Sequence, residues 1–178
     1  LFTVMARTDP STPGASGISA FIVERDSPGL SVGKKDVKMG QRGTHTADVI
    51  FDDCLVPFEN RIGKEGQGFK TAMKVLDRGR LRIAGMSVGA AERLIEECVS
   101  YAKERFQFGK PIAEFQLIQA MLADSEAETY AARCMLMDAA QLRENGKTIT
   151  KEAACAKMFA SGMVGRVADR AVQLFGGA

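Results

Sequence analysis

Histidine and cysteine, the residues that most often bind transition metals or serve catalysis, are scarce in this chain. It has one histidine, His45, and four widely spaced cysteines without a CxxC pair. A zinc site needs a cluster of such ligands, so the sequence predicts no metal site. A Ser-His-Asp triad would depend on His45, which lies in a turn-like GTHT stretch, and is disfavoured. Reduced packing thiols fit a cytosolic or organelle-matrix compartment.

Long apolar runs and an excess of one charge are also missing. No run approaches the roughly 18 residues of a membrane span, and no charged segment with an apolar core marks a signal peptide. The net charge is +2, and residues 1–62 hold 7 Lys/Arg and 8 Asp/Glu against 17 and 14 in the rest. Composition therefore gives no case for a nucleic-acid partner. With 46% apolar and 26% charged residues, the composition is ordinary for a globular protein.

The glycine fingerprint of a dinucleotide-binding βαβ unit is incomplete. Gly66 and Gly68 form a G-x-G, but the third glycine is missing, so a nicotinamide-binding interpretation fails. An initiator Met is absent too: the chain begins at Leu1 inside an apolar run and stops at Gly-Gly-Ala, where a helix is expected to end. We therefore expect a piece of a longer protein.

The first part of the sequence has β character. Residues 1–62 hold four of the five prolines, and short apolar runs alternate there with turn residues. The expected strands are FTVMAR (2–7), ISAFIVE (18–24), the weaker LSVGKK (30–35) and the stronger ADVIFDDCLVP (47–57). Strands separated by Pro/Gly turns favour an antiparallel sheet over βαβ units.

After Gly63 the apolar period becomes helical. Three helices are predicted, over 68–106, 113–144 and 150–174, with Asn145-Gly146 ending the second and Thr150 as N-cap of the third. Their Met and Ala stripes are interpreted as core packing. The predicted fold class is α+β: an antiparallel β-domain portion at 1–62 followed by an α-helical bundle domain at 63–178. The residues expected on the inner faces are Ile118, Leu122, Thr129, Ala132, Leu136 and Ala139, and then Ala156, Phe159, Met163, Val167, Ala171 and Leu174.

The stretch ERFQFGKPIAEFQ, residues 104–116, interrupts the helical pattern. Arg105 lies near a helix C-terminus, where a cation suits the helix dipole or forms a surface ion pair. A phosphate clamp is the alternative, because a guanidinium makes two parallel hydrogen bonds to phosphate oxygens. Phe108 and Gly109 would then let a flat ligand approach, and Gln116 could donate its amide to the same ligand.

Two further stretches are unusual for a plain bundle. In QLFGGA, residues 173–178, the two glycines after a helix are also typical of an ordinary C-cap. In LDRGRLR, residues 76–82, Asp77, Arg78 and Arg80 interrupt an apolar helix. Because buried charges are costly unless paired, this turn either faces water or lines a pocket for a polar ligand.

The order of these motifs resembles that of the acyl-CoA dehydrogenases, and the resemblance covers nearly the whole chain. The similar segments are MGQRGTHTADVIFDDCLVP, LDRGR, ERFQFGKPIAEFQ, EAACAKMFAS and AVQLFGG. Each is weak alone, but five in order at family-like spacing are strong together. The resemblance implies a middle β-domain, of which the last part is present, and most of a C-terminal helical bundle.

The resemblance also implies ligands and partners. FAD is the implied cofactor, lying across a subunit interface, so a homodimer or homotetramer follows; an electron-transferring flavoprotein is the implied electron acceptor. Asp77, Arg78, Gly79 and Arg80 match the stretch that contacts the acyl-CoA substrate. The residues that match FAD-contacting positions are Arg105, Phe108, Gln116, Gln173, Leu174, Phe175, Gly176 and Gly177.

The implied reaction is the α,β-dehydrogenation of an acyl-CoA thioester in fatty-acid or branched-chain acyl catabolism. A glutamate removes the α-proton, and the β-hydrogen leaves as hydride to the flavin. That glutamate lies beyond the Gly-Gly in most of the family and at the position of Gly79 in a minority, so we assign no catalytic residue and expect this chain alone to be inactive. A bacterial cytoplasm or a mitochondrial matrix would fit. Acyl-CoA oxidases, flavin monooxygenases and a non-catalytic interaction module stay open, as does the acyl chain length.

Overall fold

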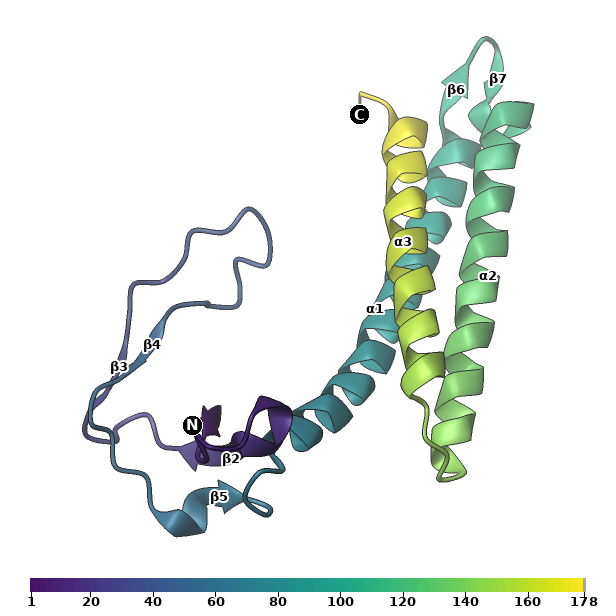
Figure 1. Ribbon diagram of the computed structural model, residues 1–178. Helices are drawn as coiled ribbons and strands as arrows, with labels where there is room; N and C mark the ends of the chain where they lie inside the picture. The colour runs from purple at the N-terminus through teal and green to yellow at the C-terminus, as the bar shows by residue number, and fades with distance from the viewer. Residues whose placement is uncertain (178) are drawn as a thin grey trace. The chain divides into compact units, whose positions relative to one another are not determined.

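The fold is seen in a computed structural model that describes residues 1–177 (Figure 1). It divides into two compact units, Leu1–Lys74 and Val75–Ala178, and the division falls within the first long helix. The first unit carries two small antiparallel sheets and the second a helical bundle.

The first unit contains two small sheets. A three-stranded sheet has the order β1–β2–β5, with Met5 opposite Ala20 and Phe21 opposite Arg61. A separate pair joins β3 and β4, and every strand pairing is antiparallel, as predicted. The elements are β1 (Phe2–Arg7), η1 (Gly14–Gly17), β2 (Ile18–Val23), β3 (Leu30–Val32), β4 (Val49–Phe51), η2 (Phe58–Asn60) and β5 (Arg61–Ile62).

The strand predicted over 47–57 is wrong in extent, because only β4 forms there. Asp53 adopts a positive φ of 46°, which turns the chain out of the extended conformation. The N–H of Asp52 donates to the carbonyl of Gly29 at 2.8 Å. The apolar run Val49–Phe51 therefore marks a short strand that ends in a turn rather than a long strand.

The G-x-G at Gly66 and Gly68 serves close packing in the first unit. A Cβ on Gly66 would lie 2.3 Å from the carbonyl oxygen of Ser16, and one on Gly68 would lie 2.4 Å from the carbonyl carbon of Ser19. The N–H of Gly66 donates to the hydroxyl of Ser19 at 2.9 Å. Only glycine lets the backbone pass this close to η1 and β2, which explains the motif without a nucleotide.

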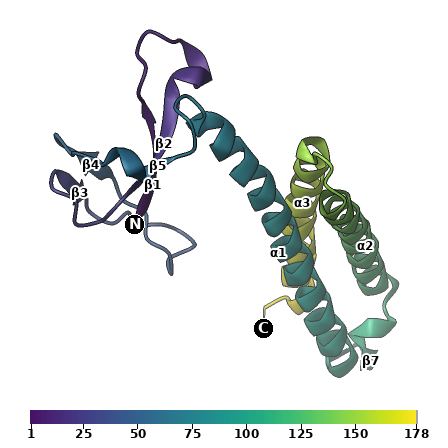
Figure 2. The same cartoon turned by 90° about the horizontal axis from the view of Figure 1, so that it is seen from below.

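Three helices form the second unit, and all three were predicted. They are α1 (Gly68–Glu104), α2 (Gln116–Glu144) and α3 (Thr150–Phe175). Asp77 of α1 contacts Thr150 at the start of α3, and Tyr101 near the end of α1 contacts Phe175 at the end of α3. Helices α1 and α3 therefore run parallel to each other, with α2 antiparallel to both (Figures 1 and 2).

The core of the bundle is built largely from alanine. Its central cluster combines five fully buried alanines with Val88, Met163 and Val167. Small side chains let helix backbones approach closely. The predicted inner faces are confirmed, with Phe159 and Leu136 packed against the cluster from its edge. The alanines are Ala84, Ala91, Ala132, Ala156 and Ala160.

The helix ends match the predictions in one case of two. Asn145 is the C-cap of α2 and Gly146 follows with a φ of 73°, as expected of a glycine C-cap. Thr150, however, is not the N-cap of α3: Ile149 holds that position and forms no side-chain cap. The Thr150 hydroxyl instead donates to Asp77 Oδ2 at 2.8 Å.

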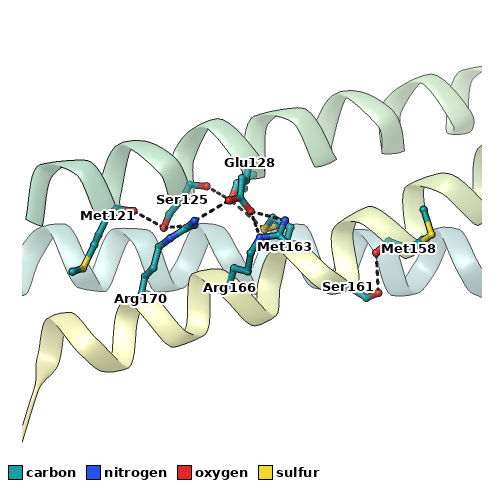
Figure 3. Close-up of polar contacts among 9 residues, drawn as sticks. Met121, Ser125, Glu128, Met158, Ser161, Met163, Arg166 and Arg170 are labelled. Carbon is teal, nitrogen blue, oxygen red and sulfur yellow. Dashed lines mark hydrogen bonds and ion pairs between the residues drawn. The ribbon is translucent and has the colours of Figure 1, made fainter. Parts of the chain in front are cut away.

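A charged network joins α2 to α3 (Figure 3). Glu128 of α2 accepts hydrogen bonds from Arg166 at 2.7 Å and from Arg170 at 2.9 Å, and Arg170 also reaches the Ser125 hydroxyl at 3.5 Å. The hydrogen bond from Arg166, more than that from Arg170, lowers the pKa of Glu128 below its ordinary value. Glu128 is therefore ionised at neutral pH.

The cysteines stay unpaired, as expected. All four are free, and burial, with a smaller contribution from the Glu97 carboxylate, raises the pKa of the Cys98 thiol. No group of three or more potential metal ligands occurs in residues 1–177. None of the helices in these residues has an apolar stretch long enough to cross a bilayer.

Candidate functional site

A pocket of about 1270 Å³ lies at the end of the bundle where α1 and α3 terminate. Both views place the C-terminal end of α3 at the same end as the β6–β7 hairpin (Figures 1 and 2). All eight residues predicted to contact a cofactor line this pocket, although they come from two segments far apart in sequence. The volume exceeds that of most drug-sized sites, so the pocket suits an extended ligand.

The segment between α1 and α2 forms a hairpin that the sequence did not reveal. Strand β6 (Phe106–Gln107) pairs with β7 (Lys110–Pro111), and η3 (Ile112–Glu114) leads into α2. Phe108 and Gly109 form the turn with φ values of 53° and 82°. Two consecutive positive φ values are those of a type I′ turn, in which a bulky first residue is strained. Phe108 is 93% exposed.

Arg105 stands immediately after α1 as an exposed cation at the pocket. Its N–H donates to the carbonyl of Tyr101 at 2.9 Å, which continues the helical pattern to the pocket edge. Among residues 1–177 its guanidinium forms no ion pair and no hydrogen bond, so the surface ion pair considered from the sequence does not form. Its donors are free for a ligand.

Lys110 supplies a second cation to the pocket. Its ammonium lies 4.6 Å from the ring centroid of Phe115 and 3.9 Å from the Glu114 carboxylate. Phe108 also meets the Phe115 ring edge-on, with centroids 6.2 Å apart. The hairpin side of the pocket thus combines positive charge with aromatic surface.

The α3 side of the pocket supplies its floor and its glycines. Leu174 is buried and Phe175 half-buried, whereas Gln173 is exposed. Gly176 caps α3 with φ 65° and ψ −128°, and its N–H donates to the Val172 carbonyl. The C-cap interpretation of the two glycines is therefore confirmed, and the same glycines also line the pocket.

Several lining residues were not among those predicted. The sequence pattern predicts Tyr101 only as part of an apolar helix face, although Tyr101 precedes Arg105 by one helical turn, a spacing that places both on one side. Gln116 at the start of α2 was predicted, whereas its neighbours were not. The remaining unpredicted lining residues are Gln107, Lys110, Ile112, Glu114, Phe115, Leu117 and Ile118.

The Asp77–Arg80 stretch lies at the opposite end of the bundle. Asp77 Oδ1 accepts a hydrogen bond from Arg80 at 2.5 Å, and its other oxygen accepts from Thr150. Arg78 is exposed, and a Cβ on Gly79 would meet no neighbour within 4 Å. The turn thus faces outward with its carboxylate paired internally. At 1.5 Å per residue, Asp77 and Tyr101 are about 36 Å apart along α1.

Comparison with known proteins identifies relatives across the whole length. The family model described as "Acyl-CoA dehydrogenase, C-terminal domain" matches residues 66–178, and "Acyl-CoA dehydrogenase, middle domain" matches residues 1–54. A curated relative, caffeyl-CoA reductase-Etf complex subunit CarC of Acetobacterium woodii, is 48% identical over 174 residues, which are 98% of this chain and 46% of that protein.

Solved structures give the same result. Butyryl-CoA dehydrogenase from Megasphaera elsdenii is 46% identical with a TM-score of 0.93, over 98% of this chain and 45% of that one. A structure described as "PigA with FAD and proline" is 32% identical with a TM-score of 0.95, over 99% of this chain and 46% of that one. The chain spans a little under half the length of the curated relatives it matches.

Proposed function

Because the chain belongs to the acyl-CoA dehydrogenase family, we propose that its parent protein is an FAD-dependent acyl-CoA dehydrogenase that oxidises acyl-CoA thioesters between the α and β carbons. The observation that carries this proposal is the pocket at the end of the bundle. Two segments separated by more than fifty residues meet there and present the eight residues expected to bind FAD. FAD, when bound, accepts the hydride that the substrate loses.

The pocket suits the chemistry of FAD. A pyrophosphate needs cationic and hydrogen-bond donors, and Arg105 presents an unpaired guanidinium that fits phosphate oxygens in a bidentate way. The amides of Gln116 and Gln173 add donors from either side. Gly176 and Gly177 have no side chains that would block the approach of a ligand, and Phe108 offers a flat surface.

The Asp77–Arg80 stretch is proposed to contact the acyl-CoA. Arg78 and Arg80 are cations suited to the phosphates of coenzyme A, and Asp77 fixes the position of Arg80 through their ion pair. Because about 36 Å of helix separates Asp77 from Tyr101, one copy cannot place both sets around a single small site. We therefore propose that one copy of the chain supplies the cofactor residues and a second copy the substrate residues, within a homodimer or homotetramer.

Several assignments follow from this proposal. The β-domain portion covers 1–62 and the helical domain 63–178. We assign no proton-abstracting residue within residues 1–177, since glycine stands at position 79. An electron-transferring flavoprotein is the proposed acceptor, which agrees with the Etf complex of the Acetobacterium woodii relative. The proposed pathway is fatty-acid oxidation, in a bacterial cytoplasm or a mitochondrial matrix.

The visible spectrum of the full-length protein tests the proposal. The purified protein should carry a flavin band, and Arg105→Ala should lose it or bind added FAD about 30-fold more weakly, which corresponds to about 2 kcal/mol of charge-assisted hydrogen bonding. Arg93→Ala is the matched control, because Arg93 is an exposed arginine of α1, the helix that Arg105 follows, and it pairs with Glu96 and Glu97. Absence of flavin from the wild-type protein, even after FAD is added, would refute the proposal and favour an interaction module.

The electron acceptor separates a dehydrogenase from an oxidase. With a short-chain acyl-CoA as the electron donor, the flavin-loaded protein should reduce an electron-transferring flavoprotein and consume little oxygen. Rapid oxygen consumption with peroxide release would instead assign an acyl-CoA oxidase.

A further inference from the structure

Two aromatic rings link the ends of α1 and α3 beside the pocket. The rings of Tyr101 and Phe175 stack with centroids 4.5 Å apart and an interplanar angle of 35°. The Tyr101 hydroxyl also lies 3.5 Å from the carbonyl oxygen of Phe175. At that distance the hydrogen bond is weak, so the stacked rings are the main contact. We call Tyr101 and Phe175 the ring pair.

The ring pair connects the two halves of the cofactor pocket. Tyr101 is one turn before Arg105 and accepts its N–H at the backbone carbonyl. Phe175 directly precedes Gly176 and Gly177. Both rings also pack on the buried cluster of Cys98, Ala102, Ala171 and Leu174. The pair is therefore the outermost of the contacts that hold the arginine segment and the glycine segment relative to each other.

This contact matters because the glycine segment is intrinsically flexible. Glycine loses more backbone entropy on ordering than any other residue, and Gly176 adopts a φ of 65° with a ψ of −128° that other residues rarely reach. A ligand that must order such a segment binds more weakly than one that meets it already ordered. The ring anchors the residue just before the glycines, so the segment starts from a fixed point.

We propose that Tyr101 is a positioning residue for the cofactor: by stacking on Phe175 it holds the Gly176–Gly177 segment opposite Arg105 before FAD binds. The inference rests on the proposed function. It assigns a role to a residue that no motif indicated, and it places the determinant of FAD affinity partly outside the residues that touch the cofactor's charged groups.

The test uses the full-length protein with its flavin removed, and FAD itself as the probe. Tyr101→Leu and Phe175→Leu keep an apolar side chain in the core but abolish the stack, and each should raise the Kd for FAD about tenfold, the factor expected from an aromatic pair of about 1.4 kcal/mol. Tyr101→Phe keeps the ring and should stay within about twofold of wild type. The double leucine variant should bind FAD only slightly more weakly than either single variant. Each single substitution already removes the contact between the two rings, so the second substitution removes nothing more.

A stability control separates positioning from general damage. Leu142→Ala removes apolar packing from the cluster around Leu81 and Ile149, toward the other end of the bundle. It should lower the melting temperature at least as much as Tyr101→Leu while leaving the Kd for FAD unchanged. If Leu142→Ala weakens FAD binding as much as the leucine variants do, the ring pair has only a structural role and the inference is overturned.

The remaining outcomes are distinguishable. Wild-type affinity in both leucine variants overturns the inference and leaves the proposed function intact. If Tyr101→Leu fails to fold, Tyr101→Met and Tyr101→Phe still decide the result, since the first removes the ring and should weaken FAD binding and the second should preserve it. A wild-type protein that binds no FAD refutes the proposed function and the inference together.

Discussion

The network around Glu128 gives the most direct test of how the bundle is held together (Figure 3). The change is Glu128→Gln, which keeps the size of the side chain and removes its charge. Glu128 and Arg170 are each about three-quarters buried, with 24% and 23% of their side chains exposed, whereas Arg166 is 51% exposed. Two charge-assisted hydrogen bonds are weakened at once, but partial exposure screens them.

The expected loss lies between two limits. Exposed ion pairs contribute about 0.2–1 kcal/mol, and hydrogen bonds to charged groups about 1.5–3 kcal/mol. For one carboxylate with one half-exposed and one mostly buried partner, we expect a loss of about 1.5 kcal/mol at pH 7. That corresponds to a melting temperature of the helical unit that is lower by about 7 °C.

The pH dependence identifies the cause. The pKa of Glu128 in the folded state is below its ordinary value of 4.5, so its stabilising effect is fully present above that value. The effect is lost as the pH falls through the lowered folded pKa. Thermal unfolding of the full-length protein should therefore show a difference between wild type and variant at pH 7 that shrinks below pH 4.5.

A matched carboxylate serves as control. Glu92 accepts from a single arginine, Arg133, and both side chains are more exposed, at 34% and 55%. Glu92→Gln should cost less than about 0.5 kcal/mol. Equal losses for the two variants at pH 7, or a Glu128→Gln loss that is unchanged at pH 3, would refute the reasoning.

Two further predictions concern the first unit and its entry into α1. Gly68→Ala should lower the stability of the full-length protein by about 2 kcal/mol or more, since its Cβ would lie 2.4 Å from the Ser19 backbone. Gly89→Ala is its control, since a Cβ there meets nothing within 4 Å, and alanine in a helix should stabilise by about 0.5–1 kcal/mol; a loss at Gly89 comparable to that at Gly68 would contradict the packing argument. The pKa of Asp9 should be about 2, because the Ser11 hydroxyl and other donors of the turn form hydrogen bonds to its carboxylate. NMR titration checks this, and Ser11→Ala should raise the pKa toward 3.8; a value near 3.8 in both proteins would show that the hydrogen bonds do not persist in solution.

The helices were predictable because their signal is long and periodic. Helices α1 and α3 are 37 and 26 residues long, and an apolar period sustained over that length identifies a helix. The predicted helix ends lie within a few residues of the observed ones. The predicted 47–57 strand is too long because apolar residues stand on both sides of Asp52 and Asp53, while the turn there depends on a backbone φ and a hydrogen bond to Gly29. Thr150 failed as an N-cap for a similar reason: its hydroxyl found Asp77, which is 73 residues away in sequence.

The pocket was predictable in its parts but not in its assembly. Resemblance to a family selected Arg105 and the glycine segment, and the structure brings both to one pocket. Composition could not reveal the Phe108–Gly109 turn, because a phenylalanine at positive φ violates local preference. Tyr101 was missed since an aromatic residue on an apolar helix face has the same pattern whether it fills a core or supports a site.

The alanine-lined centre of the bundle has a consequence for which substitutions the protein tolerates. In most cores the harmful changes remove atoms and leave a cavity. Here the central residues, such as Ala84, Ala132 and Ala160, are fully buried, and each side chain is a single methyl group, so a substitution can remove very few atoms. Added methyl groups would instead force neighbouring backbones apart along a whole helix. Variation among natural versions of this sequence should therefore favour glycine and serine over valine at the centre, while the larger residues at its edge, such as Phe159, vary more freely.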